Sequence, residues 1–276
     1  MEYIFDDRAL ILRSEELTVL VATDLHIGYE IDTLERTGAA FPDQKEPLLK
    51  RLKALVDRYH LDHIYLIGDI KHSIGVDRAY NWREIPSFME ELSRWVDLTV
   101  IPGNHDGDVI ALLPRNVHLG DVHGELAPFD SHRIGLIHGH AWPSSEVLEC
   151  DTIVMGHNHP TVRRVKDVSS PQIGRPDRKR ASHIIPVALK TKLDRDCVRR
   201  AQEQLEIGDG TSTLVVLPSF NDLLTGVYVN RPNVKLQGPI FDNDCVTLVN
   251  SEVYSSTGIF LGTIEMLQKQ FLDSGQ

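Results

Sequence analysis

The sequence predicts a layered α/β fold, and two observations carry that prediction. Short apolar runs alternate with amphipathic helical patterns through the first half of the chain, which is the order expected of βαβ units. Most of these runs are apolar at consecutive positions, as in strands of a sheet whose two faces are both covered. With 276 residues, of which 41% are hydrophobic, the chain can bury a sizeable core.

The strands and helices of the first half can be placed in order. Strands are expected at 9–13, 17–23, 64–69, 98–103, 133–139 and 151–156. Helices are expected at 42–60, 82–96 and, as a short one, 107–114. The first of these helices has the clearest pattern, because four leucines and a valine recur at helical spacing and cover one face.

The composition changes after Val165. Residues 166–182 are polar and basic and contain prolines, which predicts an exposed loop. Further elements are expected as a strand at 183–193, a helix at 194–206 and a strand at 212–220. We expect residues 237–276 to form C-terminal strands and a helix packed on the same domain, so that residues 1–276 make a single domain.

The net charge of −11 weighs against a general nucleic-acid binder, because phosphate backbones attract lysine and arginine. Nucleic acid stays possible as a partner through a local basic groove. The charge suits a monomer or a small homo-oligomer. The N-terminus lacks the pattern of a signal peptide, and no run approaches the ~20 apolar residues that span a bilayer, so no membrane association is expected.

The cysteines predict neither a disulfide framework nor a zinc site built from thiolates. There are three of them, Cys150, Cys197 and Cys245, an odd number without a CxxC pair. A reducing, cytoplasmic location is the simplest expectation.

Five of the apolar runs end in residue types that bind metal ions. These residues are Asp24 and His26; Asp69 and His72; Asn104, His105 and Asp106; His138 and His140; and His157 and His159. Sites in open α/β sheets form beyond the carboxyl ends of the strands, so these loops can meet in space. Carboxylate oxygen with imidazole nitrogen suits Mn²⁺, Fe or Zn²⁺. There are too many candidate ligands for one ion, which favours a pair of ions bridged by a carboxylate.

Each of these histidines alone is more often structural than functional. Five coincident strand ends argue otherwise, because burying so many imidazoles and carboxylates without partners would be very costly. Metal ions would supply those partners.

The five motifs, DLH, GD, GNHD, HGH and GHNH, occur in this order between residues 24 and 159. As a set they resemble the signature of the calcineurin-like metallophosphoesterases. The resemblance implies a four-layer αββα sandwich in which two facing mixed sheets are flanked by helices. It also implies a hydrolase that acts on phosphate esters through two divalent metal ions, with Mn²⁺ favoured and Fe, Zn²⁺ or Ni²⁺ possible.

The resemblance assigns roles to these positions. Asp24, His26 and His159 resemble the ligands of one metal, Asp69 the bridging carboxylate, and Asn104, His138 and His157 the ligands of the second metal. His105, helped by Asp106, resembles the histidine that meets the substrate phosphate and protonates the leaving group. Asn104 would contact substrate as well, and His72 and His140 would each either line the phosphate pocket or support a ligand.

One departure from the signature bears on the substrate. Many phosphatases of the family have an aspartate where this chain has His72, whereas GDIKH resembles the pattern of the SbcD-type DNA-repair nucleases. The segment PSFNDLLTGVYVN, 218–230, is also similar to archaeal-type SbcD-related phosphoesterases. We therefore expect attack by a metal-bridging hydroxide on a phosphodiester. A DNA nuclease and a non-catalytic metal-binding scaffold of the same fold are the alternatives.

Overall fold

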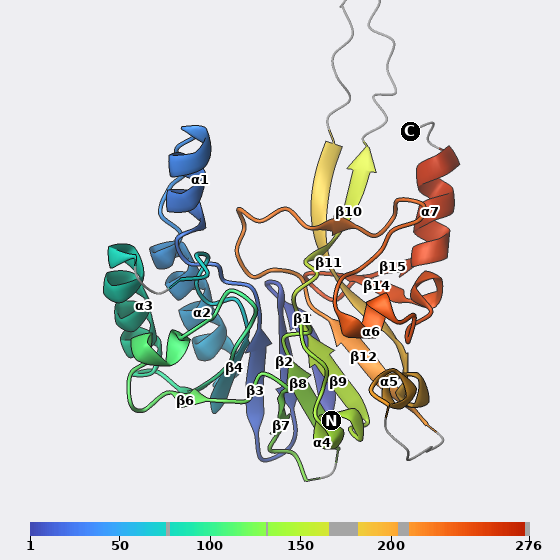
Figure 1. Cartoon of the computed structure of the whole chain (residues 1–276), viewed down its shortest axis with the longest axis horizontal. Coiled ribbons are helices and arrows are strands. Elements are labelled where there is room, and N and C mark those ends of the chain that lie inside the picture. The colour runs from blue at the N-terminus through green and yellow to red at the C-terminus, as the bar shows by residue number, and fades with distance from the viewer. Residues whose placement is uncertain (76–77, 131, 166–181, 204–209, 274–276) are drawn as a thin grey trace, which may run out of the picture.

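The computed structural model describes residues 1–75, 78–130, 132–165, 182–203 and 210–273. Its two β-sheets face each other, with helices on both outer sides (Figure 1). This is the four-layer α/β architecture that the resemblance implied. Within the described residues, no helix is long and apolar enough to cross a membrane.

The first sheet has six strands in the order β1-β2-β3-β4-β5-β6. Their bounds are Glu2–Asp6, Ala9–Arg13, Thr18–Ala22, His63–Ile67, Asp97–Ile101 and His118–Leu119. The first three strands are antiparallel, and β3 to β6 run parallel. Parallel neighbours need long crossover connections, which is why helices separate β3, β4 and β5 along the chain.

The second sheet has nine strands, and its main path runs β13-β10-β11-β12-β9-β8-β7. The strand β14 pairs with β11 and β15, away from this path. The bounds of β7 to β15 are Glu125–Ala127, Ile134–Ile137, Thr152–Met155, Pro160–Val165, Ser182–Asp194, Thr211–Val216, Val227–Tyr228, Glu252–Ser255 and Phe260–Thr263. The neighbours β8, β9 and β12 are parallel.

The helices fall into two outer layers and one protrusion. Their bounds are α1 Tyr29–Thr37, α2 Lys45–Tyr59, α3 Ala79–Leu92, η1 Val109–Leu112, α4 Ser145–Leu148, α5 Arg195–Ala201, α6 Pro239–Asp242, η2 Leu248–Asn250 and α7 Ile264–Asp273. Figure 1 shows α2 and α3 beside the six-stranded sheet, α5 and α6 on the other side of the molecule, and α1 rising from one end.

The core has three parts that match these layers. One cluster lies between the six-stranded sheet and α2 and α3, and includes Leu52 and Phe88. A second, which includes Val198 and Ile240, lies outside the nine-stranded sheet. The third, which includes Tyr65 of β4, fills the space between the two sheets. Strands buried on both faces explain the consecutive apolar residues in the sequence.

Most expected elements are present with shifted ends. The helix expected at 42–60 is α2, the one at 82–96 is α3, and the short helix at 107–114 is the single turn η1. The helix α1 was not predicted, because it is only nine residues long and its buried residue is the charged Glu30. The loop expected at 166–182 lies outside the described residues, apart from Ser182 at the start of β11.

The prediction of no disulfide was wrong. Cys197, in α5, is bonded to Cys245, which follows α6. The two are 48 residues apart in sequence, and their Cα atoms lie 5.3 Å apart because α5 packs beside the segment after α6. Spacing along the chain could not reveal a pair brought together by tertiary packing. The remaining cysteine, Cys150, is free and buried.

Candidate metal centre

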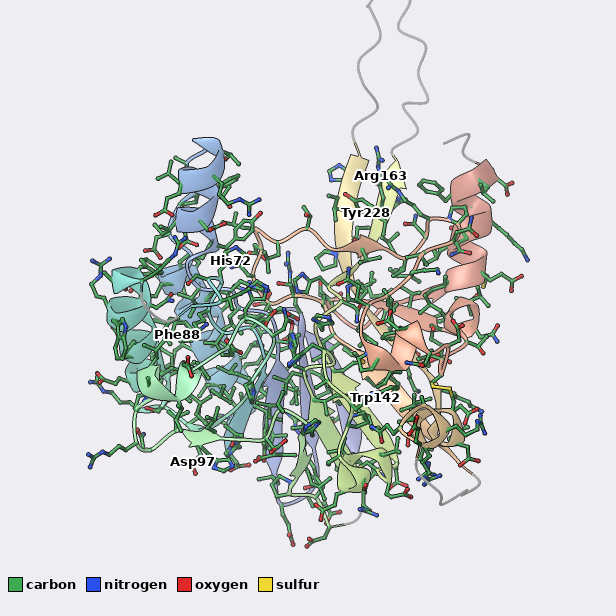
Figure 2. All side chains as sticks on the ribbon, viewed as in Figure 1. His72, Phe88, Asp97, Trp142, Arg163 and Tyr228 are labelled. Carbon is green, nitrogen blue, oxygen red and sulfur yellow. A yellow bond between two sulfur atoms is a disulfide. The ribbon has the colours of Figure 1, made fainter. Side chains whose placement is uncertain are left out.

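The five motif-bearing loops converge at one end of the two sheets. They follow β3, β4 and β5 in the first sheet and β8 and β9 in the second, and within each sheet these strands are parallel. The carboxyl ends of such strands lie at one edge, which is where sites form in α/β folds. In Figure 2, His72 lies at this end, near the base of α1, whereas Asp97, the first residue of β5, lies at the opposite end.

Main-chain hydrogen bonds fix the loops against one another. The amide of Asp24 donates to the carbonyl oxygen of Gly68 over 3.0 Å, and the amide of His26 donates to that of Asp69 over 2.8 Å. A side chain could not replace the hydrogen of Gly103, since a Cβ atom there would lie 2.2 Å from Oδ1 of Asp69. The site is therefore built from tightly packed main chain.

Several of the candidate ligands share an unusual backbone conformation. A positive φ is uncommon for residues other than glycine and persists where the surrounding structure enforces it, often at functional sites. The φ angles are 58° at Asp24, 44° at His26, 52° at Asp69, 69° at His157 and 43° at His159.

Asp24, His26 and His159 form the first donor group. Their ligand atoms lie within 4.8 Å of one another. Oδ2 of Asp24 accepts hydrogen bonds from the hydroxyl of Thr23, over 2.8 Å, and from the amide of His157, over 3.1 Å. Oδ1 of Asp24 lies 2.9 Å from Nε2 of His159 and 3.9 Å from Nε2 of His26. One oxygen thus anchors the carboxylate and the other faces the two imidazoles.

Asp69 lies between this group and a second one. Its Oδ1 accepts a hydrogen bond from the amide of His105 over 2.9 Å. Its Oδ2 lies 3.4 Å from Nε2 of His26 and 3.5 Å from Nε2 of His138. A single carboxylate oxygen therefore faces one imidazole from each side of the site.

Asp69, His138 and His157 form the second donor group, again with ligand atoms within 4.8 Å of one another. Nδ1 of His138 lies 3.0 Å from the carbonyl oxygen of Ile67, so Nδ1 carries a proton and Nε2 is the nitrogen that faces the donor group. Nε2 of His138 is also 3.2 Å from Oδ1 of Asn104. The amide oxygen of Asn104 thus joins the second donor group.

The protonation states suit the binding of cations. Burial lowers the pKa of His26 to about 3 and the pKa values of His157 and His140 to about 4, so these imidazoles are neutral at neutral pH. Burial alone would raise the pKa of Asp69, but the hydrogen bond and charge of His138 lower it to about 2. The carboxylates of Asp69 and Asp24 outweigh the effect of burial on His138 and raise its pKa to about 9. The region therefore strongly favours positive charge.

The residues present fit a pair of divalent ions. Oδ1 of Asp24 is buried and faces Nε2 of His159 at 2.9 Å without a well-aligned hydrogen bond from any described residue. Burying a carboxylate oxygen without a well-formed hydrogen bond is costly, and a cation would relieve that cost. Carboxylate, imidazole and amide donors without thiolate match the hard to intermediate divalent metals. The two donor groups could each hold one ion, with Asp69 beside both.

His105 lies at the edge of the two groups, half-buried. Its Nδ1 donates a hydrogen bond to the main-chain oxygen of His72, which leaves Nε2 free to face outward. Its ring centroid lies 4.8 Å from that of His26. The ring is thus held beside the first donor group by main chain rather than by a carboxylate.

The expectation that Asp106 helps His105 is corrected by the structure. The buried carboxylate of Asp106 accepts hydrogen bonds from the amides of Gly103 and Ile70, each over 2.9 Å, and of Lys71 over 3.3 Å. Burial, reinforced by the charge of Asp69, raises the pKa of Asp106 to about 6. Asp106 therefore ties the loop after β5 to the loop after β4 and makes no contact with the ring of His105.

His140 and Asn158 are the remaining polar residues of the motifs that follow β8 and β9 of the second sheet. The ring of His140 lies 5.3 Å from that of His138, and its Nδ1 is buried without a hydrogen-bond partner among the described residues. Asn158 points away from both donor groups: its side chain accepts from the amide of Gln237 over 2.6 Å and donates to the Gln237 carbonyl over 3.1 Å. It braces the turn that separates His157 from His159.

Two residues near the site were missed in the sequence. Lys71 is fully buried, and its ammonium group donates to the main-chain oxygens of Ser73, over 2.9 Å, Ile74 and His105. Asp32, on α1, places Oδ2 3.5 Å from Nε2 of His72. Lysine and aspartate are usually solvated, so neither carried a signal in the sequence.

Three solved structures are similar to this chain. The Pseudomonas putida nuclease MPE has a similar fold, with 17% identity, a TM-score of 0.52, and coverage of 93% of this chain and 96% of that one. A protein of unknown function from Aquifex aeolicus matches with 20% identity, a TM-score of 0.35, and coverage of 51% and 78%. An archaeal phosphodiesterase matches with 17% identity, a TM-score of 0.31, and coverage of 54% and 78%.

A match to a family model identifies the family of this chain. The model of the calcineurin-like phosphoesterases matches residues 17–185, more than half of the chain and every candidate metal ligand. The resemblance seen in the five motifs is therefore confirmed at the level of the family. The chain belongs to the calcineurin-like phosphoesterases and is a hydrolase that acts on phosphate esters.

Proposed function

We propose that this chain is a binuclear metal-dependent phosphodiesterase. One observation carries the proposal: Oδ2 of Asp69 faces Nε2 of His26 at 3.4 Å and Nε2 of His138 at 3.5 Å. A carboxylate oxygen placed between imidazoles of two donor groups is the arrangement that a bridging ligand requires. A single-ion site would leave one of the two sets without a role.

The ligands divide between two ions in this proposal. Asp24, His26 and His159 would hold one ion, Asn104, His138 and His157 would hold the other, and Asp69 would contact both. The two ions, when bound, lower the pKa of a water molecule and neutralise charge on the phosphoryl oxygens. Mn²⁺ is the favoured metal, since the oxygen and nitrogen donors suit it.

The protein's own groups would position the substrate and move the proton. The amide of Asn104 is exposed and His140 is half-exposed, so both can reach a phosphate oxygen at the mouth of the site. Nδ1 of His105 is occupied by the carbonyl oxygen of His72, so a proton for the leaving oxygen would come from Nε2. The ring would therefore have to carry a proton on both nitrogens before the transfer and would keep the one on Nδ1 afterwards. Asp106 and Lys71 would serve by fixing the loop that carries His105.

The preference for a diester rests on the position of His72. A histidine there, in GDIKH, replaces the aspartate of many monoester phosphatases of the family and resembles the SbcD-type nucleases. DNA is therefore the second candidate substrate. The net charge of −11 weighs against a long polyanion and favours a small diester.

The test is an assay of the purified chain after metal removal. With added Mn²⁺ we expect turnover of bis-p-nitrophenyl phosphate to exceed that of p-nitrophenyl phosphate. Metal content should approach two ions per chain. Cleavage of single- or double-stranded DNA at a higher rate than the small diester would favour the nuclease, whereas two bound ions without turnover of any ester would point to a scaffold.

Location and assembly are part of the same proposal. A monomer or a small homo-oligomer agrees with the net charge. The proposed cytoplasmic location no longer has the support of the cysteines, because Cys197 and Cys245 form a disulfide. Light scattering of the purified chain would measure the oligomeric state.

A further inference from the structure

We propose that His72 and Asp32 orient His26 for metal binding, as a chain of contacts that runs from α1 to the first donor group. This inference rests on the proposed function, because it concerns one ligand of the proposed metal pair. It gives His72 a positioning role in place of contact with the substrate phosphate. It also gives a role to α1, the helix that rises beside the site (Figure 1).

Three contacts make up the chain. Nε2 of His26 faces the first donor group, 3.4 Å from Oδ2 of Asp69. Nδ1 of His26, on the other side of the ring, lies 3.2 Å from Nδ1 of His72. Nε2 of His72 in turn lies 3.5 Å from Oδ2 of Asp32.

If His26 binds a metal ion, only one combination of tautomers of His26 and His72 is compatible with their contact. A histidine that binds a metal through Nε2 carries its proton on Nδ1. That proton has Nδ1 of His72 as its acceptor, so His72 must be unprotonated at Nδ1 and protonated at Nε2. The carboxylate of Asp32 favours that tautomer, because it faces the protonated Nε2.

The surroundings of His72 hold its ring in this position. Its amide donates to the carbonyl oxygen of Ile27 over 3.0 Å, and its own carbonyl oxygen accepts from His105. The ring of Tyr29 meets it edge-on, with centroids 5.0 Å apart. Both ring nitrogens of His72 therefore face groups of the protein, which leaves neither directed at a substrate.

A third metal site is the competing interpretation of the same histidines. Ligand atoms of His26, His72 and His105 lie within 4.8 Å of one another. However, the two Nδ1 atoms of His26 and His72 face each other at hydrogen-bond distance, and Nδ1 of His105 is occupied by a carbonyl oxygen. A shared proton fits this geometry better than an ion does.

The test measures Mn²⁺ affinity of the full chain by electron paramagnetic resonance of the free ion. Asp32→Ala should weaken one of the two ions about tenfold and leave the other unchanged, as expected when a ligand loses its outer partner. The matched control is Glu35→Ala. Glu35 is on the same helix and binds Arg78, which also approaches Asp32, but it has no contact with His72. It should change neither affinity.

A double variant separates positioning from a general loosening of α1. If Asp32 acts through His72, Asp32→Ala should have an effect below about twofold in a His72→Leu background, because contacting residues in one network are not additive. His72→Gln, whose amide oxygen can still accept from His26, should bind better than His72→Leu. Thermal unfolding of each variant checks that it is folded.

The tautomers can be read without any metal. In ¹⁵N spectra of the metal-free chain, Nδ1 of His72 should have the shift of an unprotonated nitrogen and Nε2 that of a protonated one. The opposite tautomer would overturn the inference, as would an unchanged Mn²⁺ affinity in Asp32→Ala or loss of a third ion in His72→Leu. Absence of ester turnover in the wild type, by contrast, would overturn the proposed function and leave this spectrum unaffected.

Discussion

The two donor groups differ in what orients their imidazoles. In the second group, Nδ1 of the fully buried His138 is held by the carbonyl oxygen of Ile67, which is the main chain of β4. In the first group, Nδ1 of His26 faces the side chain of His72, and behind it lies Asp32 on a surface helix.

The two donor groups therefore differ in whether the contact that orients an imidazole can be changed by substitution. A main-chain carbonyl at the end of a central strand cannot be removed by substituting a side chain, so the orientation of His138 comes with the fold. A side-chain partner can be replaced, and the residues behind His26 can vary while the sheet stays the same. Substitutions can therefore be chosen to disturb both donor groups, one donor group or neither, and each choice tests a different set of contacts.

The largest effect is expected from Asp69→Asn, which should disturb both groups at once. The amide keeps the shape of the side chain but removes the charge that faces His26 and His138. Ester hydrolysis should fall to the background of the assay, and elemental analysis should find both ions depleted.

Asp97→Asn is the control for that experiment. Asp97 lies at the opposite end of the strands (Figure 2) and is exposed. It should leave turnover and metal content unchanged. Loss of only one ion in Asp69→Asn would show that this carboxylate belongs to a single group.

His105→Ala should slow hydrolysis and leave both groups intact. The ring is fixed by the carbonyl oxygen of His72, and the amide, not the ring, contacts Asp69. Loss of a general acid typically costs about 10²- to 10⁴-fold in rate. Turnover and metal content measured on the same preparation test this, and depletion of metal together with activity would mean that His105 is itself a ligand.

Much of the site could be predicted from the sequence because its ligands sit at the ends of strands. Parallel strands place their carboxyl ends at one edge, so Asp24, Asp69 and His138 could be expected from the sequence to meet. The four layers followed from the same alternation of strands and helices together with the family signature.

The rest depended on contacts that leave no pattern in the chain. Asp32 could not be connected to His72, because their contact joins α1 to the loop after β4 and leaves no spacing pattern in the chain. Lys71 reads as a solvated residue, yet it is fully buried on three carbonyl oxygens. The role of Asp106 was misassigned because adjacency to His105 in sequence suggested a contact that the turn does not allow.

Asn158→Ala should loosen both groups modestly, because Asn158 lies between His157 and His159. Its side chain holds the amide and the carbonyl of Gln237, and loss of the two hydrogen bonds should cost about 1–3 kcal/mol of unfolding free energy. Mn²⁺ affinity should fall for both ions, by about tenfold or less. Urea denaturation and the Mn²⁺ titration measure the two effects.

The chain offers a close structural match as the control. Asn230 is equally buried and makes the same pair of hydrogen bonds with the main chain of Arg163, over 3.0 and 2.9 Å. Asn230→Ala should therefore destabilise the fold to a similar extent without changing Mn²⁺ affinity. Equal losses of affinity in the two variants would show that Asn158 acts through overall stability alone.

The smallest effect on the site is expected from Cys197→Ser, which removes the disulfide with Cys245. The bond joins α5 to the segment after α6, on the outer side of the nine-stranded sheet, and neither cysteine belongs to a donor group. Its loss should lower the free energy of unfolding by about 2–4 kcal/mol, because the unfolded chain gains conformational freedom. Turnover and both Mn²⁺ affinities should stay at the wild-type values. Dithiothreitol should shift the unfolding curve of the wild type to that of the variant and leave the variant's curve in place, whereas a change in either Mn²⁺ affinity on reduction would show that the outer layer of the second sheet is coupled to the metal centre.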